Sequence, residues 1–183
     1  MAKSRAPEHL EIRRGDAGDA AALTAFARLT FVETYERLNS PSDTNLHLDE
    51  FYYEGRQREE LINPNMCTLL ALVHSELVGF AQLEKGVVPQ CIEAEGAVGL
   101  KRYYVKSNWH GKGIAAPLLS AAVGAARLMN ATHLWLTVWD QNLRAIAFYH
   151  KVGFKQVGSC TFVVGSDPQN DSVMALDLQS CAA

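Results

Sequence analysis

The sequence predicts one α/β domain with a mixed β-sheet of about seven strands and about four helices. In the middle of the chain, strand-like runs alternate with amphipathic helical runs, and two consecutive strand–helix units require a parallel segment in the sheet. Toward the C-terminus, two runs rich in β-branched residues with no helix between them predict a closing antiparallel pair. Residues 1–9 are expected to be a flexible N-terminus, and residues 10–183 the folded domain.

The first third of the chain predicts a short strand and two helices. Residues 10–14 are the strand, and Asp16 or Asp19 caps a helix whose apolar residues recur at helical spacing. Residues 39–45, which include a proline, are predicted to be a turn-rich break. A second helix is expected over residues 46–62.

The remaining elements follow from β-branched and aromatic runs and from helical periodicity. Strands are predicted over residues 67–73, 77–84, 100–105, 133–138, 154–165 and 173–178. The first two of these strands form a hairpin through residues 74–76, and residues 86–96 are a loop. Helices are predicted from Gly113 onward and over residues 143–152.

Composition is that of a compact enzyme domain. The chain has 183 residues, of which 48% are hydrophobic and 20% charged, with a net charge of −3. These values exclude a disordered or fibrous protein, and the lack of a basic stripe argues against a nucleic-acid partner. No apolar run approaches the roughly 18 residues of a membrane span, and residues 1–9 lack the apolar core of a signal peptide. A cytoplasmic protein is therefore expected.

The cysteines predict reduced thiols and no metal site. Cys67, Cys91, Cys160 and Cys181 form no Cys-x-x-Cys pair and have no histidine at metal-ligand spacing. Neither a disulfide nor a bound metal is expected.

A glycine-containing turn between a strand and a helix is the most informative stretch of the chain. It lies within residues 108–118, which read NWHGKGIAAPL. The first turn of a helix leaves four backbone N–H groups without intrahelical partners and carries about half a positive charge, so it binds anions where no side chain shields it. Gly111, Gly113, Ala115 and Ala116 leave these groups bare, which predicts a phosphate site. Residues 110–114 are called the glycine turn below.

Two common phosphate-binding motifs can be tested by spacing. The Walker A motif needs Gly-Lys followed by Ser or Thr, but Lys112 is followed by Gly113. The pattern Gly111-x-Gly113-x-x-Ala116 satisfies the dinucleotide-binding fingerprint, which would imply NAD(H). However, residues 106–110 separate the predicted strand from Gly111, whereas that fingerprint places its glycines directly after the strand.

A third motif fits better. The segment His110-Gly-Lys-Gly-Ile-Ala115 resembles the signature of the Gcn5-related N-acetyltransferase (GNAT) family, which is Gln or Arg, two residues, Gly, any residue, and Gly or Ala. Only the first position differs, where His110 replaces Gln or Arg. A second block is similar to the family's fifth strand, its asparagine loop and the helix with its tyrosine: Leu134-Trp-Leu-Thr-Val-Trp-Asp-Gln-Asn142, Ala145, Phe148-Tyr149 and Gly153-Phe154. The resemblance covers roughly residues 67–178.

This resemblance implies a single GNAT domain with the acyl-CoA N-acyltransferase fold, and acetyl-CoA as co-substrate. Backbone groups of residues 103–105 would hold the pantetheine arm, and N–H groups of residues 111–116 would hold the pyrophosphate. Asn142 would contact the arm near its reactive end, and Tyr149 would lie close to the sulfur. The residues implied in cofactor binding are Tyr103, Tyr104, Val105, His110, Gly111, Lys112, Gly113, Ile114, Ala115, Ala116, Asn142 and Tyr149.

Acetyl transfer to an amine needs a proton donor for the thiolate and a proton acceptor for the ammonium. A tyrosine with a pKa near 10 stays protonated at neutral pH, so Tyr149 is the expected general acid; the alternative is an aromatic that only packs. An alkylammonium costs about 4–5 kcal/mol to deprotonate at pH 7. Glu33 is the first candidate for the base and Asp140 the second, and the alternative for each is a solvated surface acid.

Three cations are further candidates for ligand contacts. Lys101 and Arg102 precede the glycine turn, and Lys151 ends the helix that carries the tyrosine. The alternative for each is an exposed surface cation, because strand alternation and helix ends commonly leave such side chains in solvent.

Parts of both chain ends resemble a bacterial branch of the family that includes the polyamine-acetylating PaiA proteins. The matching stretches are Phe31-Val-Glu-Thr-Tyr35, Asn39-Ser-Pro-Ser-Asp43, and Phe162-x-x-Gly165-x-Asp167-x-Gln169-x-Asp171 with Met174. Residues 31–54 also contain six acids against Arg37 alone, a local charge of −5 that favours a cationic amine. The acids are Glu33, Glu36, Asp43, Asp49, Glu50 and Glu54. The alternative is a solvated helix face.

The sequence therefore predicts an N-acetyltransferase that transfers acetyl from acetyl-CoA to a primary amine, specifically a small cationic amine or polyamine. Direct attack in a ternary complex is expected, because neither motif block contains a cysteine that could carry the acyl group. The alternative is a non-catalytic acyl-CoA sensor. The sequence leaves the natural acceptor and the oligomeric state open, a homodimer included.

Overall fold

The computed structural model describes residues 6–35, 40–86, 88–164 and 167–179. Two short 3-10 helices, η1 (Ala17–Asp19) and η2 (Ser107–Trp109), precede α1 and α4. The other elements are β1 (Leu10–Arg14), α1 (Ala20–Tyr35), α2 (Pro41–Phe51), α3 (Glu54–Ile62), β2 (Met66–Val73), β3 (Glu76–Glu84), β4 (Val98–Val105), α4 (Ala115–Leu128), β5 (His133–Trp139), α5 (Leu143–Lys151), β6 (Lys155–Val164) and β7 (Asp167–Asp177). Of residues 1–9, only 6–9 lie within the described ranges.

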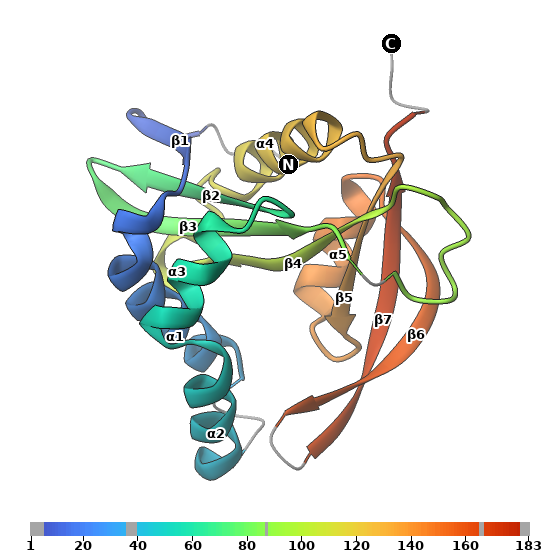
Figure 1. Ribbon diagram of the computed structural model, residues 1–183, viewed down its shortest axis with the longest axis horizontal. Helices are drawn as coiled ribbons and strands as arrows, with labels where there is room; N and C mark the ends of the chain where they lie inside the picture. Colours follow the sequence, from blue (N-terminus) through green and yellow to red (C-terminus); the bar gives the residue numbers. More distant parts are fainter. Residues whose placement is uncertain (1–5, 36–39, 87, 165–166, 180–183) are drawn as a thin grey trace.

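The seven strands form one sheet in the order β1-β2-β3-β4-β5-β7-β6 (Figure 1). The central pair, β4 and β5, is parallel, which confirms the predicted parallel segment, and the other pairs are antiparallel. Only one parallel pair occurs in the described sheet, so the dinucleotide-binding interpretation, which requires a doubly wound parallel sheet, is wrong.

The central pair is joined over a short distance. β4 and β5 pair only at Val98 with Leu134 and at Gly99 with Trp135, and the other described residues of the two strands do not pair with each other. Beyond Gly99 the two strands separate, and the edge of β4 that faces β5 has no neighbouring strand. This gap in the centre of the sheet lies next to the residues discussed below.

Helices cover both faces of the sheet, and each face has its own hydrophobic core. On one face, α1, α2 and α3 pack over Leu70 and Phe80. On the other face, α4 and α5 pack over a larger cluster that includes Leu134, Leu136 and Tyr149. Figure 1 shows α4 and α1 on opposite sides of β2 and β3. No described helix is long and apolar enough to cross a membrane.

The predicted helix over residues 46–62 is wrong, because two helices occupy this region. Ser40 caps α2, its Oγ accepting the Asp43 N–H at 3.1 Å, and Pro41 begins the helix, where its missing N–H costs nothing. The turn predicted over residues 40–45 is therefore helical, and Asn39 lies outside the described residues. The helix ends where Tyr52 leaves helical geometry at φ −127° and ψ 52°, so the described chain has five α-helices where about four were expected.

Other boundaries differ by a few residues. The β2–β3 hairpin turns at His74 and Ser75, whose φ values of 49° and 65° suit a two-residue turn. Helix α4 begins at Ala115, later than the predicted Gly113, because Gly113 has a left-handed φ of 80°. Strand β7 begins at Asp167, six residues before the predicted start, since it pairs with β6 from Asp167 to Ala175.

Candidate active site

The glycine turn has the geometry of an anion site. Gly111 and Gly113 have φ values of 74° and 80°, in the left-handed region that favours glycine. No side chain caps the start of α4, and a Cβ added at Gly111 would meet no atom within 4 Å. Pro117 follows in the first turn and has no N–H of its own. The backbone N–H groups at this helix start are therefore unshielded, as the sequence predicted.

The His110 side chain points back to β4. Its Nε2–H donates to the Val105 carbonyl at 2.6 Å, and its Nδ1 accepts from Arg144 on α5. Partial burial, and then the positive charge of Arg144, lower the pKa of His110, although Val105 and Glu33 act in the opposite direction. A neutral imidazole thus ties the glycine turn to β4 and α5.

The free edge of β4 is formed by alternate residues. Lys106 N–H donates to Val78 O on β3 at 3.0 Å, and Tyr104, two residues earlier, pairs with Phe80 on the same strand. In an antiparallel ladder the backbone groups of alternate residues point to opposite edges. The backbone of Tyr104 is therefore bonded to β3, which corrects its predicted role in pantetheine binding. The backbones of Tyr103 and Val105 face the gap, and the Val105 carbonyl is already occupied by His110.

Tyr149 lies on the buried side of α5. Tyr149 is 7% exposed, and its ring contacts the rings of Tyr103, Phe148 and Phe154. Burial, followed by the electrostatic influence of Tyr35, raises the pKa of Tyr149 well above its ordinary value. The phenol therefore remains protonated throughout the neutral range. Tyr35 ends α1 on the other face of the sheet, so the two side chains interact through the gap between β4 and β5.

Asn142 and Asp140 lie in the loop after β5. Asn142 caps α5, its Oδ1 accepting the Ala145 N–H at 3.2 Å, which leaves its amide NH2 group unused by the cap. Asp140 is exposed, and its Oδ1 accepts the Ser172 hydroxyl at 2.5 Å. Both residues follow the end of β5, and only Asn142 offers a hydrogen-bond donor, because the ionised Asp140 carboxylate can only accept.

Glu33 is bound to the segment that precedes the glycine turn. Its Oε2 accepts the backbone N–H of Ser107, and its Oε1 accepts the Ser107 hydroxyl, both at 2.9 Å. Glu33 is exposed on α1, and Ser107 begins η2. The carboxylate therefore joins the first helix to the segment that leads into the predicted phosphate site.

Lys101 and Arg102, which the sequence offered as candidates for ligand contacts, are both engaged by Glu60. Arg102 is buried under α3, pairs with Glu60 and donates to Gln82 Oε1 at 2.6 Å. Lys101 Nζ lies 3.3 Å from the other oxygen of Glu60. Burial opposes the charge of Glu60, but Arg102 and Lys101 outweigh it and lower the pKa of the carboxyl. Lys151 is exposed at the end of α5.

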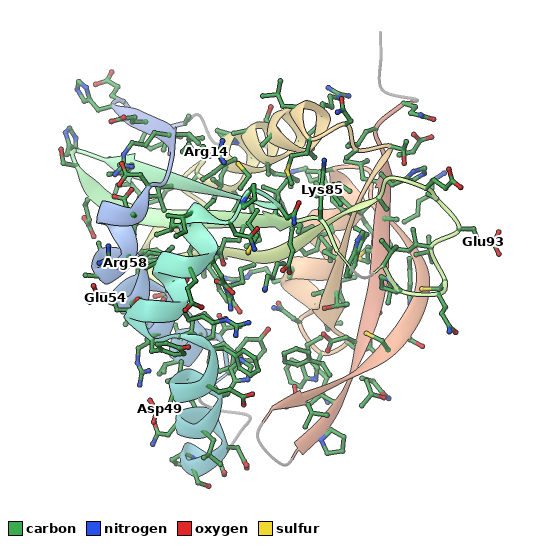
Figure 2. The ribbon with its side chains drawn as sticks, viewed as in Figure 1. Arg14, Asp49, Glu54, Arg58, Lys85 and Glu93 are labelled. Atoms are coloured by element: carbon green, nitrogen blue, oxygen red, sulfur yellow. The ribbon has the colours of Figure 1, made fainter. Side chains whose placement is uncertain are left out.

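The acidic segment at residues 31–54 is partly neutralised by neighbours outside it. Asp49 pairs with Arg28 at 3.0 Å, and Glu54 pairs with Arg58 at 2.9 Å. Figure 2 shows Asp49, Glu54 and Arg58 on the outer side of α2 and α3, away from the β6–β7 hairpin. Glu36 and Arg37 lie outside the described residues. The local charge of −5 counted from the sequence therefore overstates the negative field of this surface.

An aromatic cluster around His47 was not anticipated from the sequence. His47 on α2 is 6% exposed, stacks on Phe31 at 4.6 Å between ring centroids, and meets the edge of Phe162 from β6. Burial, and then the charge of Arg102, lower the pKa of His47 to about 4. These contacts join the β6–β7 hairpin to α2, and Figure 1 shows one end of that hairpin near α2.

Asp171 on β7 is the second residue that sequence reasoning missed as a site residue. It lies opposite Trp139 on β5 and Cys160 on β6, and is 6% exposed. Its Oδ1 is buried and has no hydrogen-bond partner among the described residues, while the Thr137 hydroxyl interacts with the carboxylate. Burial, and then the nearby charge of Asp140, outweigh that hydrogen bond and raise the pKa of Asp171 to about 6. The sequence signal that could have identified it is an acid two residues before the apolar stretch that begins at Val173, on the same side of the strand as Val173.

Comparison with known proteins assigns the family. Residues 32–154, about two thirds of the chain, match the acetyltransferase (GNAT) family. The chain belongs to the GNAT family. The uncharacterized N-acetyltransferase Rv2669 of Mycobacterium tuberculosis is 32% identical over 160 residues, which cover 87% of this chain and 98% of the relative. This GNAT protein is therefore an N-acetyltransferase, and the alternative of a non-catalytic sensor is set aside.

More distant relatives include proteins named for their substrates. The spermine/spermidine N(1)-acetyltransferase of Bacillus subtilis is 31% identical over 90 residues, 48% of this chain and 58% of that protein. Among solved structures, the PaiA N-acetyltransferase of Thermoplasma acidophilum in complex with coenzyme A has a TM-score of 0.75 and 24% identity, over 92% of this chain and 98% of that one. This structural similarity confirms the fold expected for the family.

Proposed function

We propose that this GNAT protein transfers an acetyl group from acetyl-CoA to a small cationic primary amine, by direct attack in a ternary complex. The observation that carries the proposal is the unshielded start of α4 after a strand with a free edge, with the buried ring of Tyr149 packed against Tyr103 of that strand. The glycine turn suits the pyrophosphate, the free edge of β4 suits the pantetheine arm, and Tyr149 suits the thioester. The relative crystallised with coenzyme A supports the choice of donor.

Each part of acetyl-CoA has its own binding group in this proposal. Within the glycine turn, the N–H groups of His110 and Lys112 already donate to the carbonyls of Ser107 and Trp109. The N–H groups of Gly111, Gly113 and Ile114 bind the pyrophosphate, with the helix dipole adding to the attraction. Backbone groups of Tyr103 and the N–H of Val105 hold the pantetheine arm, and the amide NH2 of Asn142 contacts it near the thioester. Acetyl-CoA supplies an activated acyl group with a thiolate leaving group. Tyr149 donates a proton to that thiolate, which its raised pKa allows across the neutral range.

His110 and Lys112 have indirect roles in this proposal. His110 fixes the glycine turn through Val105 and Arg144, so the histidine at the first signature position acts on the backbone of the turn. Lys112 lies over the ring of Trp109 at 5.2 Å, on the exposed outer side of the turn, where its charge attracts phosphate over longer range.

A cationic acceptor is supported by the acids and aromatic rings on the acceptor side. Glu50 is exposed on α2, and the ring of Phe162, which contacts His47, is 41% exposed. Carboxylates and aromatic faces both favour alkylammonium ions over anions. The Bacillus relative named for spermine and spermidine supports the same class.

The test is a panel of amines assayed for thiol release from acetyl-CoA, with the acetylated product identified by mass. We expect kcat/KM for spermidine or putrescine to exceed that for glutamate by about tenfold. Attraction of the cation and repulsion of the anion, each worth up to about 1 kcal/mol, together exceed the roughly 1.4 kcal/mol that corresponds to tenfold. The preference should shrink as salt reduces the screening length from about 10 Å at 0.1 M to about 3 Å at 1 M. An anionic amino acid as best acceptor, with no salt effect, would refute the cationic class. No thiol release with any amine would refute the transferase.

A further inference from the structure

Asp171 is a buried acid whose charge no described cation balances. None of the ion pairs between described residues involves it, and its Oδ1 has no hydrogen-bond partner. The groups that face it are the Thr137 hydroxyl on β5, Asp140 after β5, Cys160 on β6 and Tyr35 on α1. These neighbours are neutral or negative. Burying an unpaired carboxyl in such surroundings destabilises the fold. A group of this kind therefore calls for an explanation, and a role in binding or catalysis is one.

The position of Asp171 relates it to the proposed acid. Cross-strand partners lie on the same face of a sheet, so Asp171 and Trp139 share the face that α1 and α2 cover. Tyr35, at the end of α1, interacts electrostatically with Asp171 and also with Tyr149, which is buried on the opposite face. The carboxylate and the phenol therefore approach the gap between β4 and β5 from opposite sides, with Tyr35 near both.

We propose, resting on the proposed acetyl transfer, that Asp171 is the catalytic residue that binds the ammonium group of the acceptor through Oδ1 and takes its proton. The rings of Trp139 and Tyr35 beside it suit an alkylammonium, which aromatic faces attract. The Oδ1 that lacks a partner in the protein is the acceptor atom that the ammonium N–H needs.

The proton balance follows from these positions. The ammonium gives one proton to Asp171, and the neutral nitrogen then forms its bond to the acetyl carbon as the carbon–sulfur bond breaks. Tyr149 protonates the leaving thiolate and recovers a proton from the new amide nitrogen. Asp171 releases its proton to solvent before the next cycle. The products are the N-acetylated amine, CoA thiol and one proton.

The two carboxylates favoured by the sequence are less suited to this step. Both oxygens of Glu33 accept hydrogen bonds from Ser107, and Asp140 is exposed and bound by Ser172. A base is most effective with a pKa near the working pH. Burial raises the pKa of Asp171 to about 6, so it is ionised at pH 7 but takes up a proton more readily than an ordinary aspartate.

The decisive variant is Asp171→Asn, with Asp177→Asn on the same strand as the matched control. Asp177 is exposed at the far end of β7, opposite His133. We expect Asp171→Asn to lower kcat/KM for spermidine or butylamine by about 10²-fold or more, the usual scale for losing a general base. The acid limb of the pH–rate profile, in which activity rises with pH through about 6, should disappear. The Kd for acetyl-CoA should stay within twofold in both variants.

A substrate that is neutral at the assay pH separates catalysis from packing. Methoxyamine needs no deprotonation, so Asp171→Asn should slow its acetylation much less than that of butylamine. Equal losses with both amines would indicate a structural role and overturn the proposal, as would an unchanged acid limb. A wild-type enzyme without transferase activity would instead refute the proposed function, since this test compares active proteins.

A measurement on the unaltered enzyme covers the case in which Asp171→Asn does not fold. A carboxyl group ionises with almost no enthalpy, so the acid limb of the wild-type profile should not move between two assay temperatures. An imidazole would shift it clearly. A temperature-dependent limb, or no limb near pH 6, would exclude Asp171 as the base.

Discussion

The carboxylate of Glu33 holds Ser107, 74 residues later in the chain, by two hydrogen bonds of 2.9 Å each. Ser107 leads directly into the glycine turn through η2, and the same turn is fixed from the other side by His110 and Arg144. The predicted phosphate site is thus positioned by α1 and α5, which cover opposite faces of the sheet. This arrangement makes Glu33 a positioning residue for donor binding.

Removing that contact should weaken donor binding. We expect Glu33→Gln and Ser107→Ala each to raise the Kd for acetyl-CoA by roughly 5–10-fold, because a hydrogen bond to a charged group contributes about 1.5–3 kcal/mol, part of which exposure removes. Ser107→Ala removes only the hydroxyl bond and keeps the one from its backbone N–H, so its effect should lie at the lower end of this range. The double variant should be little worse than Glu33→Gln alone, because the two changes share one interaction. Glu54→Gln, which breaks only the exposed pair with Arg58, is the control. Unchanged Kd values combined with a lost acid limb would restore Glu33 as the base.

Gly113 tests the phosphate site itself. Gly113→Asp should abolish retention on CoA-agarose, because it places a carboxylate at the helix start and strains a residue with φ of 80°. Gly113→Asn is the matched variant: it has the same shape and tolerates left-handed geometry better, but carries no charge. We expect it to retain weakened binding. If both proteins stay folded and bind the resin as the wild type does, the assignment of the turn is wrong.

Tyr149→Phe removes the proposed proton donor while keeping the ring packing. We expect kcat to fall by about 10²-fold with the KM for acetyl-CoA nearly unchanged, the scale for losing a general acid. Because burial raises the pKa of Tyr149, its deprotonation should produce no loss of activity near neutral pH. Phe148→Leu, a change beside it on α5, is the packing control. A kcat within twofold of the wild type in Tyr149→Phe would leave Tyr149 a packing residue.

His47 should make the fold sensitive to acid. Its pKa is lowered from 6.5 to about 4, so the unfolded chain takes up a proton first as the pH falls. The stability linked to this residue is fully present above pH 6.5 and is lost as the pH falls through about 4, amounting to at most about 3 kcal/mol. His47→Phe, which can keep the stacking on Phe31, should flatten this part of the stability curve. Thermal unfolding at several pH values measures it, with the exposed His150→Phe as control.

Local patterns were sufficient to predict most of the fold and to propose the donor side of the site. The glycines at 111 and 113, and the tyrosine after Asn142, each lie within or beside a single element, so sequence spacing is enough to single them out as candidates. The start of α2 was also encoded, by Ser40 and Pro41, but these residues equally suit a turn, and only packing of the helix decides between the two.

The acceptor side depends on contacts that sequence spacing does not reveal. Asp171 is buried because β7 inserts between β5 and β6, and nothing in the local sequence specifies that order. The guanidinium of Arg102 forms its ion pair with Glu60, which lies 42 residues earlier in the chain. The phenol of Tyr149 and the carboxylate of Asp171 come from opposite faces, and only the separation of β4 from β5 lets them act at one place.

The alternating edge of β4 also gives the strand two kinds of amide hydrogen. That of Tyr104 is bonded to β3 and should exchange slowly with deuterium, whereas those of Tyr103 and Val105 point into the gap and should exchange fast. Occupation of the gap by acetyl-CoA would slow the second kind alone. Isotope exchange along a few neighbouring residues would then report on the loading of the enzyme with donor, independently of any turnover and of the unknown acceptor.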